Sequence, residues 1–236
     1  MKILALETSA TAASVAVCED EALIAQSFQR TGLTHSATLM PMLEDLLKNT
    51  GLKLADMDVV AVAAGPGSFT GLRIGVSAAK GLAWAAEKPC AGVSTLEAMA
   101  WQLSGADGFV CAAMDARRQQ VYNALFEIKD GAPVRLTPDR AISLEELGAE
   151  LKKAEKTQIL IGDGAHLCYN AFQKLSCSVR MAPPHLQYQS AWGVARCALE
   201  QARAGKLTDA AGLVPEYHRL SQAERERLEK IKNKGV

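Results

Sequence analysis

The sequence lacks several patterns that would assign it to a specialised class of protein. None of its six cysteines forms a Cys-x-x-Cys pair, and none lies at zinc-finger spacing from a histidine. Aromatic residues make up only 5% of the chain, and no apolar run is long enough to cross a bilayer. This cysteine usage is typical of a reducing compartment, and no leader pattern opens the sequence. We therefore expect a cytoplasmic protein with no membrane contact.

An excess of charge of one sign is also missing. Lys and Arg together number 26, as do Asp and Glu, so the formal net charge is zero. A domain that holds nucleic acid by itself is normally strongly basic. We therefore expect that this chain does not bind RNA on its own.

Histidines are too scattered for a metal site. His35 begins a predicted helix, but Leu39 occupies the position where a second histidine would share its face. His166, His185 and His218 stand apart from one another. Because a lone imidazole supplies one ligand where a metal needs three or four, we expect no metal site.

What the sequence does contain is an α/β pattern that starts twice. The first unit reads βββαβαβα, with strands at 2–8, 14–18, 22–30, 59–64 and 90–93 and helices at 34–49, 69–86 and 96–103. The second has strands at 109–114, 121–128 and 158–161 and helices at 144–153, 165–175 and 190–204. Each unit opens with a strand that ends in an acid, Glu7 or Asp115, before a small polar turn.

A strand that ends in an acid and returns as a hairpin is typical of a ribonuclease H-like domain. Two such domains in tandem form the ASKHA (actin-like ATPase) fold, in which the hairpins face a nucleotide cleft. We therefore predict an α/β protein with domains over 1–104 and 105–212 and a charged tail helix over 213–236. We expect the helix near 190–204 either to belong to the second domain or to pack back on the first. The candidate cleft residues are Glu7, Thr8, Ser9, Asp115, Gly162 and Gly164.

This predicted cleft is short of catalytic groups. A kinase needs a base beside the substrate hydroxyl and carboxylates that hold Mg²⁺, yet the first hairpin contains no Asp or Lys. Asp115 is followed by Arg117 and Arg118, which either meet phosphate or simply neutralise the acid. A small-molecule kinase or ATPase of the sugar-kinase type remains the alternative function, and weak ATP or ADP binding is expected at most.

The glycine-rich segment 64–75, AGPGSFTGLRIG, lies between a strand and a helix, where backbone N–H groups can hold an anion. Its spacing fits neither the P-loop nor the dinucleotide motif, so an oxidoreductase built on 65–71 is a weaker reading that NAD(H) titration would test. Gly71, Gly75 and Ala79 form a stripe with Ala78 and Leu82, which predicts close approach of another helix, internal or from another chain.

The helix at 34–49 raises the same question. Its apolar face is wide, and Met40 and Met42 make it adaptable. The residues predicted to share this face are Leu39, Met40, Leu43, Leu46 and Leu47. Amphipathicity shows which face is buried but not what covers it. The sequence alone leaves the chain's own sheet and a partner protein as equal alternatives.

Four motifs in order, ILALETS, GPGSFTGLRIG, MDARRQQVY and VPEYHRLSQAE, resemble the TsaB (YeaZ) family. Members of that family are needed to make threonylcarbamoyladenosine in bacterial tRNA. One departure is Gln120, where family members commonly have an acid. The residues that carry the resemblance are Gly65, Pro66, Gly67, Ser68, Phe69, Thr70, Arg73, Arg117, Arg118, Pro215, Tyr217 and Arg219.

The resemblance implies an ASKHA fold with a reduced second domain and no catalytic activity of its own. It implies a scaffold that activates the catalytic subunit TsaD, binds the P-loop ATPase TsaE with it, forms homodimers when TsaD is absent, and reaches tRNA only through the complex. No intrinsic cofactor is implied, although ATP or ADP binding in the cleft or at the TsaD interface is allowed. The implied interface residues are His35, Leu39, Met40, Met42, Leu43, Leu46, Gly71, Leu72, Gly75, Ala78, Ala79 and Leu82.

Overall fold

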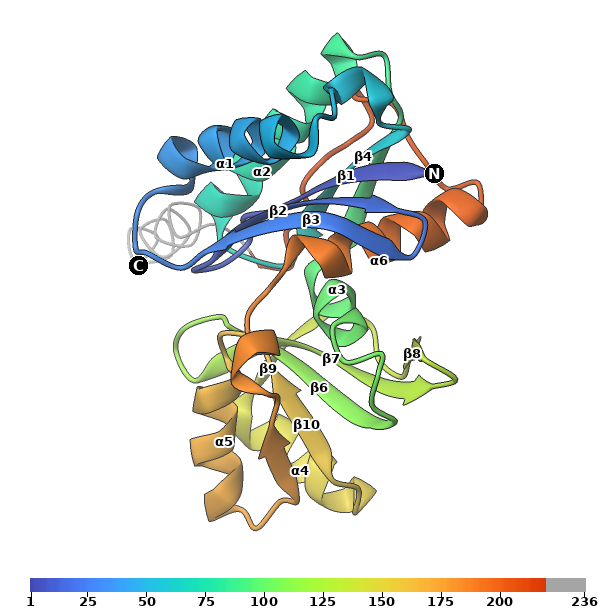
Figure 1. Ribbon diagram of the computed structural model, residues 1–236. Coiled ribbons are helices and arrows are strands. Elements are labelled where there is room, and N and C mark those ends of the chain that lie inside the picture. The colour runs from blue at the N-terminus through green and yellow to red at the C-terminus, as the bar shows by residue number, and fades with distance from the viewer. Residues whose placement is uncertain (220–236) are drawn as a thin grey trace, which may run out of the picture.

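The computed structural model describes residues 1–219 and consists of two β-sheets with helices packed on their faces (Figure 1). The predicted tail helix falls mainly on residues 220–236, which lie outside the described residues. Residues 204–219 follow the last helix and run as an arm along the first domain, and residues 213–219 of this arm form no helix. Within residues 1–219, no helix combines the length and the apolar character needed to cross a membrane.

The first sheet has the strand order β3-β2-β1-β4-β5. Its strands are β1 (Lys2–Glu7), β2 (Ala13–Glu19), β3 (Ala22–Gln29), β4 (Val59–Gly65) and β5 (Cys90–Ser94). β1, β2 and β3 form an antiparallel meander, whereas β1, β4 and β5 run parallel. β4 is buried along its whole length because helices cover both faces of the sheet, as its unbroken apolar sequence predicts.

Three helices of the described part of the chain cover this sheet. α1 (His35–Thr50) and α2 (Phe69–Ala85) lie on one face, and α6 (Ala191–Arg203) lies on the other (Figure 1). α1 ends at Gly51, which adopts the left-handed conformation of a helix C-cap at φ 69°. α2 starts at Ser68, whose hydroxyl accepts a hydrogen bond from the Gly71 N–H.

The second sheet has the order β11-β10-β6-β7-β8, and β9 also pairs with β7. The helices α4 (Leu144–Ala154) and α5 (Ala165–Lys174) cover one face, and α3 (Thr95–Trp101) packs on the other. The strands are β6 (Gly108–Asp115), β7 (Gln120–Lys129), β8 (Ala132–Arg135), β9 (Arg140–Ser143), β10 (Gln158–Ile161) and β11 (Val179–Met181). The sequence did not predict β8, β9 and β11, because each is a short, partly exposed strand with little apolar alternation.

The chain returns to the first sheet near its C-terminus. α6 packs Val194, Ala195 and Ala198 against the face opposite α1 and α2. It also approaches α3 closely, since a Cβ on Gly193 would lie 2.0 Å from the Ala98 carbonyl oxygen. Two single-turn 3-10 helices, Leu54–Asp56 and Pro184–Leu186, complete the described elements.

The arm that follows α6 is fixed to the first domain by backbone hydrogen bonds. Thr208 forms a bridge with Cys90 at the edge of β5, with N–O distances of 2.7 and 2.9 Å. Further along, the Glu216 N–H donates to the Ala64 carbonyl at 2.8 Å, and Leu213 is buried in the core beneath α1 and α2. The arm therefore covers the edge of β5 and also contacts the glycine-rich turn directly.

Candidate functional site

A cleft of about 760 Å³ lies where the carboxyl ends of β1 and β6 meet. The hairpin after β1, the glycine-rich turn before α2 and the hairpin after β6 form its walls. Of the six residues predicted to line it, only Ser9 and Asp115 do so. Glu7, Thr8, Gly162 and Gly164 are buried behind the wall instead.

Glu7 and Thr8 serve the structure of the first hairpin. Glu7 is fully buried, and its Oε1 accepts a hydrogen bond from the Ser9 N–H at 2.6 Å. Burial raises the pKa of the Glu7 carboxyl to about 7, against the opposing effect of the Ser9 hydrogen bonds, and the nearby Asp163 raises it further. The Thr8 hydroxyl donates to the Gly71 carbonyl at 2.8 Å and so ties this hairpin to α2.

The second hairpin repeats the first one's turn but is open to the cleft. Asp115 accepts a hydrogen bond from the Arg117 N–H at 2.7 Å, two residues on, as Glu7 does from Ser9. Three consecutive residues of this turn, Arg117, Arg118 and Gln119, have left-handed backbones, with φ between 55° and 65°. This conformation is costly for side chains with a Cβ, so the turn is held by its surroundings. The Arg117 side chain is 85% exposed and lines the cleft.

Asp163 is an acidic group of the cleft that the sequence analysis did not single out. It follows β10 between two glycines and accepts a hydrogen bond from the Gln189 amide at 2.8 Å. Burial raises its pKa, and that hydrogen bond opposes the shift. Gly162 and Gly164 are required by close packing, since a Cβ would lie 2.2 Å from the Ala113 oxygen or 2.8 Å from the Met114 carbonyl carbon. These two glycines therefore pack closely against the backbone of β6 and do not line a ligand site.

Basic and aromatic side chains complete the cleft. Arg30, His166, Tyr188 and Arg219 line it, and the Arg30 guanidinium lies 4.2 Å from the centre of the Tyr188 ring. Arg219 donates to the Ala116 carbonyl and so connects the C-terminal arm to the second domain. Arg30, His166 and Tyr188 come from segments with no common sequence motif, so only the fold brings them together. Within residues 1–219, no three His, Cys, Asp or Glu side chains gather in a way that would hold a metal ion.

The glycine-rich turn does not form an open anion cradle, because the chain's own backbone occupies its concave side. A Cβ would lie 2.3 Å from the Glu216 oxygen at Gly65, 2.6 Å from the Ser9 oxygen at Gly67 and 2.0 Å from the Thr8 oxygen at Gly71. Gly65 has φ 145° and is joined to Pro66 by a cis peptide bond. These glycines allow the first hairpin and the C-terminal arm to meet at the start of α2.

Arg73, on the first turns of α2, and Pro215, on the arm, lie at the same junction. The Arg73 Nε donates to the Tyr217 hydroxyl at 3.0 Å, and Pro215 is half-buried. Thr70 lines the cleft, whereas Arg118 is exposed on the second hairpin. The motif residues thus hold the turn, the arm and the cleft wall together.

Most of the predicted partner interface is internal. The apolar face of α1 and the glycine stripe of α2 pack on the first sheet, so they are not available on the surface. This correction applies to Leu39, Met42, Leu43, Leu46, Gly71, Leu72, Gly75 and Ala79, all of which are buried. A Cβ on Gly75 would lie 2.3 Å from the Thr8 hydroxyl oxygen and 3.2 Å from Val62 of β4, so the close approach predicted there is made within the first domain. The amphipathic pattern identified which faces are buried, but it could not show whether the chain's own sheet or a partner protein covers them.

The remaining predicted residues are at least partly accessible. Met40 is 45% exposed, and Ala78 and Leu82 are half-buried at the margin of α2. His35 is half-buried and its Nε2 lies 2.7 Å from the Ala10 carbonyl oxygen, so it fixes α1 to the first hairpin. Gly81 lies on the exposed side of α2, where a Cβ would meet nothing within 4 Å.

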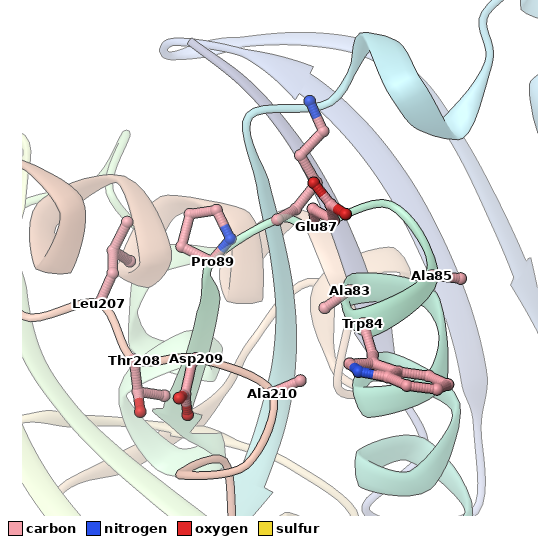
Figure 2. A pocket seen from close by; sticks show the side chains of 10 residues that line it. Ala83, Trp84, Ala85, Glu87, Pro89, Leu207, Thr208, Asp209 and Ala210 are labelled. Atoms are coloured by element: carbon pink, nitrogen blue, oxygen red, sulfur yellow. The ribbon is translucent and has the colours of Figure 1, made fainter.

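Trp84 is an exposed residue that the sequence analysis overlooked. It is 79% exposed at the end of α2 and lines a hollow of about 640 Å³. Figure 2 shows its ring projecting from the helix, with Thr208, Asp209 and Ala210 of the arm across the hollow. In the sequence, this residue could have been noticed as a single tryptophan in a helix that is otherwise rich in Gly and Ala. Large aromatic side chains left in solvent often mark protein contact sites.

Comparison with known proteins gives consistent results. The family model TsaD, tRNA N6-adenosine threonylcarbamoyltransferase, matches residues 29–226. The tRNA threonylcarbamoyladenosine biosynthesis protein TsaB of Bacillus subtilis is 33% identical over 238 residues, which is 98% of this chain and 100% of that protein. The structure of YeaZ from Pseudomonas aeruginosa superposes with a TM-score of 0.77 at 26% identity, covering 92% of this chain and 99% of the other.

A more distant likeness extends the fold comparison. Component A of (R)-2-hydroxyglutaryl-CoA dehydratase from Acidaminococcus fermentans superposes with a TM-score of 0.51 at 15% identity, over 86% of this chain and 99% of that one. At this identity the likeness concerns the fold alone. Together with the two sheets, these neighbours confirm the prediction of two tandem α/β domains of the ASKHA type.

Proposed function

This chain belongs to the TsaB family, and we propose that it acts in the biosynthesis of tRNA threonylcarbamoyladenosine as a non-catalytic subunit. In this proposal it pairs with and activates a TsaD-type catalytic subunit, and a TsaE-type P-loop ATPase binds the pair. The chain reaches tRNA only through that complex. Without its partner it forms homodimers.

The proposal rests on the first hairpin, where Glu7 and Thr8 stabilise the fold and do not face the cleft. Glu7 is fully buried and Thr8 is bonded to α2, so the polar groups at the end of β1 face the interior and not the cleft. A group that transfers a proton must come within hydrogen-bond reach of the reacting atom. Glu7 therefore orders the hairpin and Thr8 holds α2, which in turn presents an exposed face to a partner.

The proposed docking surface is the outer side of α2 with the neighbouring part of α1. It consists of Met40, Ser77, Ala78, Gly81, Leu82 and Trp84, all of which are exposed or half-buried. Small residues at 77, 78 and 81 allow another helix to approach closely, and Trp84 supplies a large apolar anchor beside a hollow. These six residues carry no charge, which suits a partner helix with an apolar face.

The test is complex formation with a purified TsaD-type subunit. Gly81→Arg adds a long charged side chain in open space, so we expect the fold to survive and the complex to be lost. Gly105→Arg is the matched control, because a Cβ there also meets nothing within 4 Å. Sedimentation velocity and threonylcarbamoyladenosine formation in a reconstituted reaction are the two measurements. Wild-type complex formation by Gly81→Arg would show that α2 is not the docking helix.

A nucleotide-binding role of the cleft is the second candidate. Arg30, Arg117 and Arg219 give the cleft three guanidinium groups that suit phosphate oxygens. We propose weak ATP or ADP binding there without turnover by the chain alone. Calorimetric titration with ATP and Mg²⁺ measures the binding, and phosphate release measures turnover. Turnover by the purified chain that is abolished in Asp115→Ala would support a sugar-kinase-type ATPase instead.

A further inference from the structure

A pocket of about 310 Å³ lies in the second domain, apart from the cleft. It is lined by the turn at 102–106 after α3, by β10 and β11, and by Pro183 and Leu186 at the second 3-10 helix. Ile159 belongs to the core cluster beneath α3, which places the pocket on the α3 side of the second sheet. Among the described residues, none lines both this pocket and the cleft. A ligand in the pocket therefore does not use the cleft residues.

The pocket lies between the two segments that connect the domains. α3 leads from β5 of the first sheet to β6 of the second, and the segment after β11 returns to α6 on the first sheet (Figure 1). The turn at 102–106 ends the first connection, and Pro183 and Leu186 begin the second. A ligand in this pocket thus contacts both connections.

Backbone hydrogen bonds hold both sides of the pocket in place. The Ala106 N–H donates to the Leu103 carbonyl at 3.0 Å, which closes the turn after α3. The Leu186 N–H donates to the Pro183 carbonyl at 2.9 Å, which closes the 3-10 turn opposite. Since these walls are ordered without a ligand, binding costs little conformational entropy in the protein.

Gln102 is a buried polar residue of the pocket wall. It is 8% exposed, and its Nε2 has no hydrogen-bond acceptor among residues 1–219. A buried amide left unpaired is unfavourable, and a hydrogen bond to a ligand removes that penalty. The terminal torsion of a glutamine is broad, so the amide can turn its NH2 group toward a ligand. Gln102 therefore indicates where an acceptor atom of a ligand binds.

Arg180 supplies the charge of the pocket. Of the described residues that line it, Arg180 alone is charged, and it forms no ion pair within the described chain. It is the register partner of Ile159 in the parallel pair of β11 and β10, so the two side chains lie on the same face of the sheet. Leu103 and Leu186 add further apolar surface. The pocket thus combines an apolar lining with one cation and one amide.

We propose that this pocket binds a small monocarboxylate with an apolar body of about eight carbon atoms. The carboxylate pairs with the Arg180 guanidinium and accepts from the Gln102 amide, and the apolar body packs on Leu103, Ile159 and Leu186. The size follows from the volume, because a water-sized atom takes about 30 Å³ and the pocket of about 310 Å³ holds roughly ten of them.

Octanoate matches this size and charge and is the probe. Titration calorimetry on the full chain should give a Kd of about 1 mM or lower. Octan-1-ol and octylammonium are the matched controls, and each should bind at least about tenfold more weakly because neither pairs with Arg180. At ten times its Kd, octanoate should raise Tm by about 3–5 °C, since it contacts both domain connections.

Two variants test the polar contacts. Arg180→Met should raise the Kd for octanoate roughly tenfold, whereas Arg118→Met, which removes an exposed arginine outside the pocket, should leave it unchanged. Gln102→Leu should raise the Kd about threefold or more. It should not lower the Tm of the unliganded chain, because it replaces an unpaired buried amide by an apolar group of similar size.

The position of the ligand can be read directly by NMR. Octanoate should shift the side-chain amide resonances of Gln102, which are identified by their loss in Gln102→Leu. Ala106→Trp places a large ring at the pocket and should abolish both this shift and the binding. Trp84→Ala alters the separate hollow beside α2 and should leave the affinity for octanoate unchanged.

Three outcomes would overturn the proposal: no binding of octanoate at about 10 mM, binding of octan-1-ol as tight as that of octanoate, or equal affinities of Arg180→Met and the wild type. The proposed function is tested separately, because the pocket and the outer side of α2 lie in different domains. Gly81→Arg should bind octanoate as the wild type does while losing the TsaD-type subunit. Failure of either result leaves the other proposal standing.

Discussion

The rings of Phe69 and Tyr217 stack with their centroids 4.4 Å apart and their planes 9° from parallel. Phe69 is the first residue of α2, and Tyr217 belongs to the C-terminal arm. Arg73 donates to the Tyr217 hydroxyl beside the stack, and Arg219 reaches the Ala116 carbonyl of the second domain. The arm thus joins the start of α2 to the second hairpin across the cleft.

We predict that Tyr217→Ala lowers the free energy of unfolding by about 1–2 kcal/mol, because it removes the aromatic stack and the contact with Arg73. Tyr217→Phe retains the ring and should recover most of that loss. Urea denaturation of both variants and of the wild type checks the prediction. Equal losses in the two variants would assign the effect to the hydroxyl and contradict the role of stacking.

Gly71→Ala should destabilise the protein strongly. A Cβ there would lie 2.0 Å from the Thr8 carbonyl oxygen, which belongs to the backbone and cannot move aside cheaply. We expect a loss of about 2–3 kcal/mol or more. Gly81→Ala, in the same helix but in open space, should instead gain up to about 1 kcal/mol from helix propensity. Chemical denaturation distinguishes the two, and a stable Gly71→Ala would contradict the tight contact between α2 and the Thr8 backbone.

Glu7 should make stability depend on pH. Its folded pKa of about 7 lies above the ordinary value of 4.5, so between these values the folded state binds more protons than the unfolded state. The free energy of unfolding should therefore fall as pH rises from about 4.5 to about 7, by up to about 3 kcal/mol, and then level off.

The control for that prediction is Glu7→Gln, which cannot ionise and retains similar shape. Its stability should vary less with pH over the same window, and above pH 7 it should equal or exceed the wild type. Asp163, whose pKa is also raised by burial, contributes with the same sign in both proteins. Parallel pH profiles of the variant and the wild type would show that Glu7 does not titrate in this range.

Trp84→Ala should weaken binding of the catalytic subunit by about 2 kcal/mol, a roughly thirtyfold rise in Kd, because exposed tryptophans at contact centres commonly anchor interfaces. Its effect on stability should stay within about 0.5 kcal/mol, since the ring is 79% exposed. Leu136→Ala is the matched control for loss of an exposed apolar side chain. Calorimetry or biolayer interferometry with the purified partner measures the change, and unaltered affinity would exclude Trp84 from the contact.

The first domain was predictable because its signals are long and periodic. The apolar strand β4 and the amphipathic α1 specify their own burial, and the Gly51 cap marks where α1 ends. The short strands β8, β9 and β11 were missed because each has four residues or fewer and is held by neighbours, not by its own pattern. Propensity over so few residues is a weak guide.

The candidate site was only partly predictable for a different reason. Sequence spacing located Ser9 and Asp115 at strand ends, and both line the cleft. It could not show that Gly71 and Gly75 contact Thr8, because a glycine stripe looks the same whether a strand or a partner helix covers it. Arg30, Asp163 and Tyr188 converge only through the fold, and Trp84 stands out only once its exposure is known.

The position of α6 means that the first sheet cannot complete its core from its own half of the chain. One face of β1 and β2 is buried only by α6, through Val194, Ala195 and Ala198. These residues leave the ribosome only after the whole second domain. A fragment ending near residue 104 would leave that apolar face in water and should aggregate. Nascent chains must therefore keep this surface covered by other means until translation is almost finished.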